Sequence, residues 1–107
     1  MTETSTELHV TLHHPEAGTI TRVLRDPPDG GDHPRPAEAL AALATAGADP
    51  FAPVPPGTIA TMIYGGPETA TVRGTWRGRP VAAEFRRNDG AQISRWDRLA
   101  PLLDIRG

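Results

Sequence analysis

Histidines are the side chains of this chain that could move protons or bind a metal, and there are four. His9 and His13 fall on one face of an expected strand but about 13 Å apart along it, too far to bind one ion. His13 and His14 point to opposite faces. His33 stands directly before Pro34, where we expect it to stabilise the turn that precedes a helix. The pattern therefore predicts surface and structural histidines and no metal site.

The remaining reactive side chains do not form a catalytic arrangement. The chain has no cysteine and no lysine, and it lacks the Gly-x-Ser-x-Gly pattern of serine hydrolases. Asp26, Asp29 and Asp32 lie in a stretch rich in glycine and proline, without the spacing of a calcium loop. No helix that could bind a phosphate is expected after Gly65-Gly66. The sequence predicts a protein that is not an enzyme and that uses no cofactor.

The stretch Thr58–Pro67, TIATMIYGGP, is the candidate for contact with another protein. Prolines between residues 50 and 56 precede it, and Gly65-Gly66-Pro67 ends it. Prolines lack the N–H that a sheet needs, and glycines weaken the interior of a strand. These flanks favour an extended segment whose apolar side chains, centred on Met62, Ile63 and Tyr64, are exposed for a partner. A strand buried between two turns is an equally good interpretation of the stretch alone.

Length and composition indicate one domain, residues 8–107, after a disordered tail at residues 1–7. The net charge of −2 argues against a nucleic-acid partner. No apolar run approaches the ~18 residues of a membrane helix, so no membrane partner is expected. The polar start does not look like a secretory signal. We expect a cytoplasmic protein if Met1 is the natural start, and a secreted one if the native N-terminus is missing.

Alternating apolar residues predict the elements of the first half. Leu8, Val10 and Leu12 share one face of a strand that ends at Pro15, and residues 19–25 form a second strand in the same hairpin. A helix is expected over residues 36–46, with proline near its start and Gly47 beyond its end. Leu40 and Leu43 lie on one stripe of this helix and should face a sheet.

The second half predicts another hairpin, made of residues 68–77 and 79–87. Its expected core or face anchors are Val72, Trp76, Val81 and Phe85. The arginines at positions 73, 77, 79, 86 and 87 are expected on its solvent side. Trp96 and Trp76 fit packing better than ligand binding. Residues 93–103 predict a short helix or a last strand, and Pro101 argues against one continuous helix there.

The ordered combination of several short motifs resembles the actinobacterial subtilisin inhibitor-like family. The motifs are His33-Pro34-x-Pro36-Ala37, the Leu/Ala helix, Met62-Ile63-Tyr64 and Gly74-Thr75-Trp76-Arg77-Gly78-Arg79. The resemblance extends from about Leu8 to Trp96. It implies an α+β fold, with an antiparallel sheet of about five strands and two helices packed on one face, usually as a homodimer.

The resemblance also implies a function, because family members are proteinaceous inhibitors of serine proteases. The loop 58–67 would enter the protease cleft like a substrate, with Met62–Ile63 as the reactive-site bond. A methionine there suits the apolar pocket of subtilisin-like or chymotrypsin-like enzymes. An alternative is a non-inhibitory intracellular binding or accessory domain that keeps the scaffold. The resemblance implies roles for other residues as well. Ile59, Ala60 and Thr61 would precede the bond in the protease cleft, and Tyr64 and Gly65 would follow it. Asn88 would brace the loop.

Family members normally carry two disulfides, and this chain resembles a cysteine-free member. The resemblance puts the first pair at Arg25 and Leu40, where Leu24 or the Arg25 stem could pack on Leu40 instead. It puts the second pair at Ala60 and Gly90, or at Ala91 if the alignment shifts by one residue. This second bridge would have clamped the loop beside Met62, and its loss predicts a weaker clamp.

Overall fold

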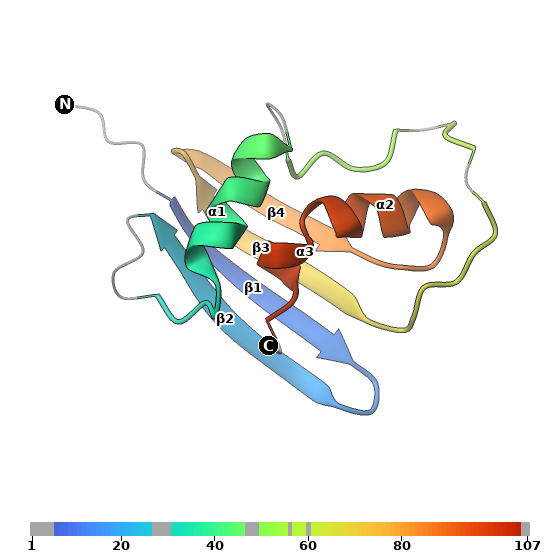
Figure 1. The fold of residues 1–107 in the computed structure, drawn as a ribbon, viewed down its shortest axis with the longest axis horizontal. Helices are drawn as coiled ribbons and strands as arrows, with labels where there is room; N and C mark the ends of the chain where they lie inside the picture. The colour runs from blue at the N-terminus through green and yellow to red at the C-terminus, as the bar shows by residue number, and fades with distance from the viewer. Residues whose placement is uncertain (1–5, 27–30, 47–49, 56, 60, 106–107) are drawn as a thin grey trace.

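The computed structural model describes residues 6–26, 31–46, 50–55, 57–59 and 61–105. Within these residues, four antiparallel strands form one sheet, and the helices cover one of its faces (Figure 1). The predicted α+β class is confirmed. The described residues contain four strands where about five were expected. Residues 93–103, which the sequence left as helix or last strand, are helical except for the junction at Leu99.

The sheet consists of β1 (Thr6–His14), β2 (Gly18–Asp26), β3 (Thr69–Trp76) and β4 (Arg79–Phe85), in the spatial order β2-β1-β3-β4. Both predicted hairpins are confirmed, and the central pairing of β1 with β3 joins them, with Val10 opposite Val72. β1 begins two residues before the predicted start at Leu8. Residues 1–5 of the expected tail lie outside the described residues.

Three helices lie on the same side of the sheet: α1 (Pro36–Thr45), α2 (Gly90–Arg98) and the short α3 (Ala100–Leu103). Pro36 occupies the first position of α1, where its missing N–H costs nothing. The side chain of Asp89 caps α2 by accepting the Gln92 N–H at 2.8 Å. The helical region breaks before Pro101, as expected. No helix in the described part of the chain is long and apolar enough to span a membrane.

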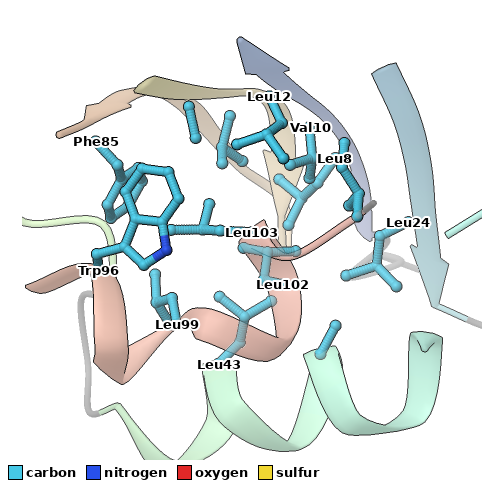
Figure 2. Packing of buried hydrophobic residues seen from close by; sticks show 14 of the residues in the cluster. Leu8, Val10, Leu12, Leu24, Leu43, Phe85, Trp96, Leu99, Leu102 and Leu103 are labelled. Carbon is cyan, nitrogen blue, oxygen red and sulfur yellow. The ribbon is translucent and has the colours of Figure 1, made fainter. Parts of the chain in front are cut away.

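The core lies between the inner face of the sheet and the helices (Figure 2). Leu8, Val10 and Leu12 of β1 are buried on one face, as their alternation predicts. Of the expected anchors in the second hairpin, Val81 is only partly buried and packs against the core. Other buried residues of this core cluster are Leu24, Leu43, Val72, Trp76, Phe85, Trp96, Leu99, Leu102 and Leu103.

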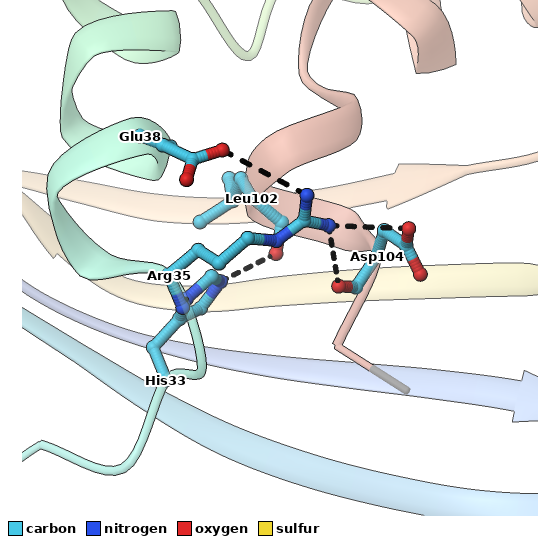
Figure 3. Close-up of polar contacts among 5 residues, drawn as sticks. All are labelled: His33, Arg35, Glu38, Leu102 and Asp104. Carbon is cyan, nitrogen blue, oxygen red and sulfur yellow. Dashed lines mark hydrogen bonds and ion pairs between the residues drawn. The ribbon is translucent and has the colours of Figure 1, made fainter. Parts of the chain in front are cut away.

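A polar contact joins the turn before α1 to the C-terminal helix (Figure 3). The buried His33 donates from Nε2 to the Leu102 carbonyl oxygen at 2.8 Å, and its Nδ1 accepts the Arg35 N–H at 3.0 Å. The Arg35 guanidinium continues the contact to the Asp104 carboxylate at 3.1 Å. His33 thus has the structural role that its position before Pro34 predicts.

Apolar packing occupies the place implied for the first disulfide. Leu24 is fully buried, and Leu40 is partly buried against the same core cluster. Arg25 instead forms an ion pair with Glu7 across the β1–β2 pair, at 3.4 Å. Leu24 of β2 and Leu40 of α1 therefore pack in one apolar cluster, and no covalent bond joins the two positions.

Candidate protein-binding loop

The stretch Thr58–Pro67 is an exposed loop in this structure, which decides between the two interpretations of its sequence. Ile59 is 98% exposed and Met62 is 97% exposed, while Ile63 and Tyr64 are each more than half exposed. None of the described residues of the stretch belongs to a strand or helix. Large apolar side chains presented together on one loop are typical of a surface that binds another protein.

Two backbone hydrogen bonds attach the loop to the segment that leads into α2. Gly90 donates its N–H to the Thr61 carbonyl oxygen at 3.0 Å, and Gly65 donates its N–H to the Arg87 carbonyl oxygen at 2.7 Å. These contacts lie on either side of Met62, Ile63 and Tyr64. The three exposed residues are therefore held at both ends by the scaffold.

A Cβ atom on either donor would meet side chains that pack against this contact. A Cβ atom on Gly65 would lie 2.8 Å from two side-chain carbons of Ile93 and 3.2 Å from the Arg87 carbonyl oxygen. A Cβ atom on Gly90 would collide with the hydroxyl of Thr61. Neither glycine has a positive φ, so the requirement comes from space and not from backbone conformation. Gly65 and Gly90 thus allow the loop to lie against α2.

Arg95 of α2 fixes the proline-rich segment that leads into the loop. Its guanidinium donates to the carbonyl oxygens of Phe51 at 3.1 Å, Ala52 at 2.9 Å and Glu84. The guanidinium also lies over the Phe85 ring, with its central carbon 4.0 Å from the ring centroid. The side chain is buried by these contacts. Arg95 therefore joins the approach of the loop, the end of β4 and α2 at one point.

Sequence reasoning missed Arg95, although one signal was present. Prolines at 50, 53 and 55 remove backbone donors, so the carbonyl groups around them need donors from elsewhere. Arginine supplies five N–H groups in a fixed fork and suits this task. The sequence could not show which of its arginines lies beside the proline segment, because the packing of α2 decides that.

An ion pair lies at the C-terminal end of the loop. The Glu68 carboxylate lies 3.6 Å from the Arg87 guanidinium and 3.9 Å from His14 Nε2. Arg87 also lies over the indole of Trp96, 5.6 Å from its centroid. Arg87 therefore contacts the loop through its carbonyl oxygen to Gly65, and it contacts the residue after the loop, Glu68, through its side chain.

Two residues implied for the loop by the family resemblance need separate mention. Ala60 lies outside the described residues. Asn88 is exposed, and no hydrogen bond recorded within the described part of the chain involves its side chain. The observed contacts come from its neighbours in sequence, Arg87 and Gly90. The bracing role of Asn88 stays a prediction.

The other candidate residues do not gather at the loop. His13 is hydrogen-bonded to Thr19 at 2.7 Å, and His9 to Glu7 at 3.1 Å, on the sheet face that carries no helix. Trp76 and Trp96 are buried in the core, as packing residues should be. Among the residues that the structure describes, no group of three or more potential ligands could hold a metal ion.

A family model for subtilisin inhibitor-like proteins matches residues 4–88, which is most of the chain. This chain belongs to the subtilisin inhibitor-like family. The family is one of protease inhibitors and not of enzymes, which supports the prediction that the chain is not an enzyme. The chain is also 46% identical over 63 residues to subtilisin inhibitor-like protein 1 of Streptomyces cacaoi, a match that covers 54% of this chain and 56% of that relative. The match thus spans just over half the length of this relative.

The residues matched to the subtilisin inhibitor-like family include the whole loop and Arg87. They end before α2, which supplies the Gly90 N–H, the Ile93 side chain and the Arg95 guanidinium. The support of the loop therefore combines residues inside the matched region with residues that follow it.

Proposed function

We propose that this chain inhibits subtilisin-like serine proteases by inserting loop 58–67 into the protease cleft, with Met62–Ile63 as the reactive-site bond. The observation that carries the proposal is the position of Met62. Its side chain is 97% exposed, at the centre of a loop whose backbone is attached to the scaffold on both sides. An unbranched apolar side chain presented in this way suits a deep apolar specificity pocket. Chymotrypsin-like enzymes, which have such a pocket, are a second target class.

The pattern of backbone contacts supports binding in the manner of a substrate. In an extended chain, the N–H and C=O groups of successive residues point to opposite sides. Thr61 and Gly65, which make the scaffold contacts, are an even number of positions apart, so their backbone groups point to the same side. The backbone groups of Met62 and Tyr64 then point to the other side, toward a partner, and can pair with the edge of the protease cleft. Ile59, Ala60 and Thr61 precede the bond in this arrangement.

The two contacts also explain how the loop could resist hydrolysis. Cleavage of Met62–Ile63 would leave one new end attached through Thr61 to Gly90 and the other through Gly65 to Arg87. The new amine would stay close to the acyl group, so that the reverse reaction competes with attack by water. A loop held in its bound conformation also loses little entropy on binding.

Titration of subtilisin and chymotrypsin with the chain tests the proposal. We expect stoichiometric inhibition by the natural chain and at least a hundredfold weaker inhibition by Met62→Asp, because a carboxylate is costly to bury in an apolar pocket. Ser94→Asp is the matched control, since it adds the same charge at an exposed position of α2, outside the loop. An equal loss for the two variants would contradict the role of Met62.

The same experiment distinguishes the alternative function. A non-inhibitory accessory domain would leave both proteases fully active and would keep its binding partner when Met62 is replaced by aspartate. No inhibition by the natural chain, or rapid cleavage at Met62–Ile63, would therefore overturn the inhibitor proposal in favour of the accessory domain.

We also propose that the chain forms a homodimer. The face of the sheet away from the helices is free of any described element (Figure 1), and it carries Thr11, Thr21 and Thr71 in register on three adjacent strands. Small side chains in such an array let a second sheet approach closely. Light scattering at micromolar concentration should give about twice the protomer mass of 11.4 kDa, and a mass of one protomer would contradict the dimer.

A cytoplasmic location is the last part of the proposal. Neither bridge expected for the family is present, and the loop is attached by hydrogen bonds, which a reducing compartment does not affect. Fractionation of the producing cells with an antibody against the chain tests this location. Finding the chain only in the culture medium, and not in the cytoplasmic fraction, would contradict this location.

A further inference from the structure

The thioether of Met62 is the most exposed oxidisable group that the structure describes. The sequence contains two methionines, Met1 and Met62, and no cysteine. Met1 lies outside the described residues, and Met62 is 97% exposed. Oxidation of methionine to its sulfoxide depends on access of the oxidant to sulfur. Within the described chain, Met62 at the centre of the loop is therefore the side chain that a peroxide reaches most easily.

Peroxides also attack tryptophan, and both tryptophans are protected. Trp76 and Trp96 are 7% and 6% exposed. Their rings are further covered by arginine side chains, Arg77 at 4.6 Å from one centroid and Arg87 at 5.6 Å from the other. A mild peroxide treatment should therefore modify Met62 well before either indole.

We propose that Met62 is a reversible oxidation site that controls protease binding. A peroxide transfers one oxygen atom to the sulfur lone pair, its O–O bond breaks, and the second oxygen leaves as water or as an alcohol. The sulfur loses two electrons, and the peroxide gains them. A thiol-dependent methionine sulfoxide reductase reverses the change, with two thiols oxidised to a disulfide and the sulfoxide oxygen released as water. The control of binding, though not the oxidation itself, rests on the proposed insertion of Met62 into the protease pocket.

The sulfoxide should weaken binding without affecting the fold. Its S–O group is polar, and burying a polar group in an apolar pocket without a hydrogen-bond donor carries a desolvation penalty. A roughly ten- to hundredfold weaker inhibition follows from the usual size of that penalty. The folded chain buries almost none of the Met62 side chain, so its thermal unfolding should be unchanged.

The test oxidises the inhibitor alone. The natural chain is treated with dilute hydrogen peroxide, the peroxide is removed, and peptide mass analysis locates the added oxygen. Inhibition of subtilisin is then measured before oxidation, after oxidation, and after treatment with a methionine sulfoxide reductase and a thiol. Met62→Leu is the matched variant, since leucine has a similar volume, stays apolar and cannot form a sulfoxide.

We expect oxidation at Met62, a loss of inhibition in the natural chain, recovery with the reductase, and no effect of peroxide on Met62→Leu. Oxidation of the tryptophans before Met62 would overturn the claim of selective access. Full inhibition by the Met62 sulfoxide would overturn the switch and leave the inhibitor function intact. Absence of inhibition by the unoxidised chain would instead refute the inhibitor function, and the switch with it.

Discussion

Gly90 donates its backbone N–H to the carbonyl oxygen of Thr61 at 3.0 Å. This contact lies beside the position at which the family resemblance implies a disulfide, between residues 60 and 90. The resemblance predicts a weaker clamp here, because the second bridge is lost. The structure shows a backbone hydrogen bond there, made possible because Gly90 has no side chain to collide with Thr61.

The first prediction concerns this contact. Gly90→Ala introduces a Cβ atom where the Thr61 hydroxyl lies, so the loop has to move away and the hydrogen bond is lost. We expect about fivefold weaker inhibition of subtilisin and faster cleavage at Met62–Ile63, in line with the typical net value of about 1 kcal/mol for one hydrogen bond. Ser94→Ala, at an exposed position of the same helix, is the control and should change neither property. Unaltered inhibition by Gly90→Ala would show that the contact does not position the loop.

The second prediction concerns Arg95. Arg95→Leu removes the donors to three carbonyl groups, of which those of Phe51 and Ala52 belong to the approach of the loop. We expect a loss of about 2–4 kcal/mol in the free energy of unfolding, measured by urea denaturation, because three part-buried hydrogen bonds from a charged donor are lost together. The exposed Arg98 of the same helix provides the control variant Arg98→Leu. Equal effects of the two substitutions would contradict the anchoring role of Arg95.

The third prediction concerns target choice. Met62→Arg places a guanidinium where the apolar side chain was, and a trypsin-like pocket carries a carboxylate that binds it. The inhibition constant for subtilisin should rise at least tenfold, and the inhibition constant for trypsin should fall at least tenfold. Thermal unfolding should stay the same, since Met62 makes almost no buried contact. The same substitution at Ile59, equally exposed, is the control, and an identical shift there would rule out Met62 as the residue that selects the protease.

The fourth prediction is a pH dependence of stability. Burial lowers the pKa of His33 below its ordinary value of 6.5, against an opposing effect of the hydrogen bond to Leu102. Its Nδ1 accepts the Arg35 N–H, so the folded state requires the neutral ring. As the pH falls below 6.5, the unfolded chain binds a proton that the folded chain does not, and the free energy of unfolding decreases.

Urea denaturation at pH 7.5 and at pH 5.5 measures this effect. The natural chain should be less stable at pH 5.5. The variant His33→Gln should be less stable than the natural chain at pH 7.5 but should lose less on acidification, because it lacks the buried imidazole. An equal loss for both chains would assign the pH dependence to groups other than His33.

The fold could be read from the sequence where one local signal was sufficient. The alternation of Leu8, Val10 and Leu12 gave the buried face of β1, and Pro36 marked the start of α1. The central pairing of β1 with β3 had no local signal, because contacts between residues more than fifty positions apart determine it. The choice between helix and strand after Ile93 was open for the same reason.

The proline and glycine flanks located the loop in the sequence, but they did not show whether the loop is buried or exposed. Exposed and buried segments can share the pattern of Met62, Ile63 and Tyr64, and only the packing of the neighbouring elements separates them. The support from Arg95 was missed because it depends on which arginine the fold brings to the proline segment. The flanks thus predicted an extended segment at this place, and the structure supplied the contacts that attach it to the scaffold.

The central claim is that Met62–Ile63 is a reactive-site bond held from both sides by the scaffold. Mass analysis of the natural chain over many hours with a small amount of subtilisin tests it most directly. We predict a single slow cut between Met62 and Ile63, with the two fragments still associated and the protease inhibited. Rapid digestion at several sites, or an intact chain beside a fully active protease, would contradict the claim.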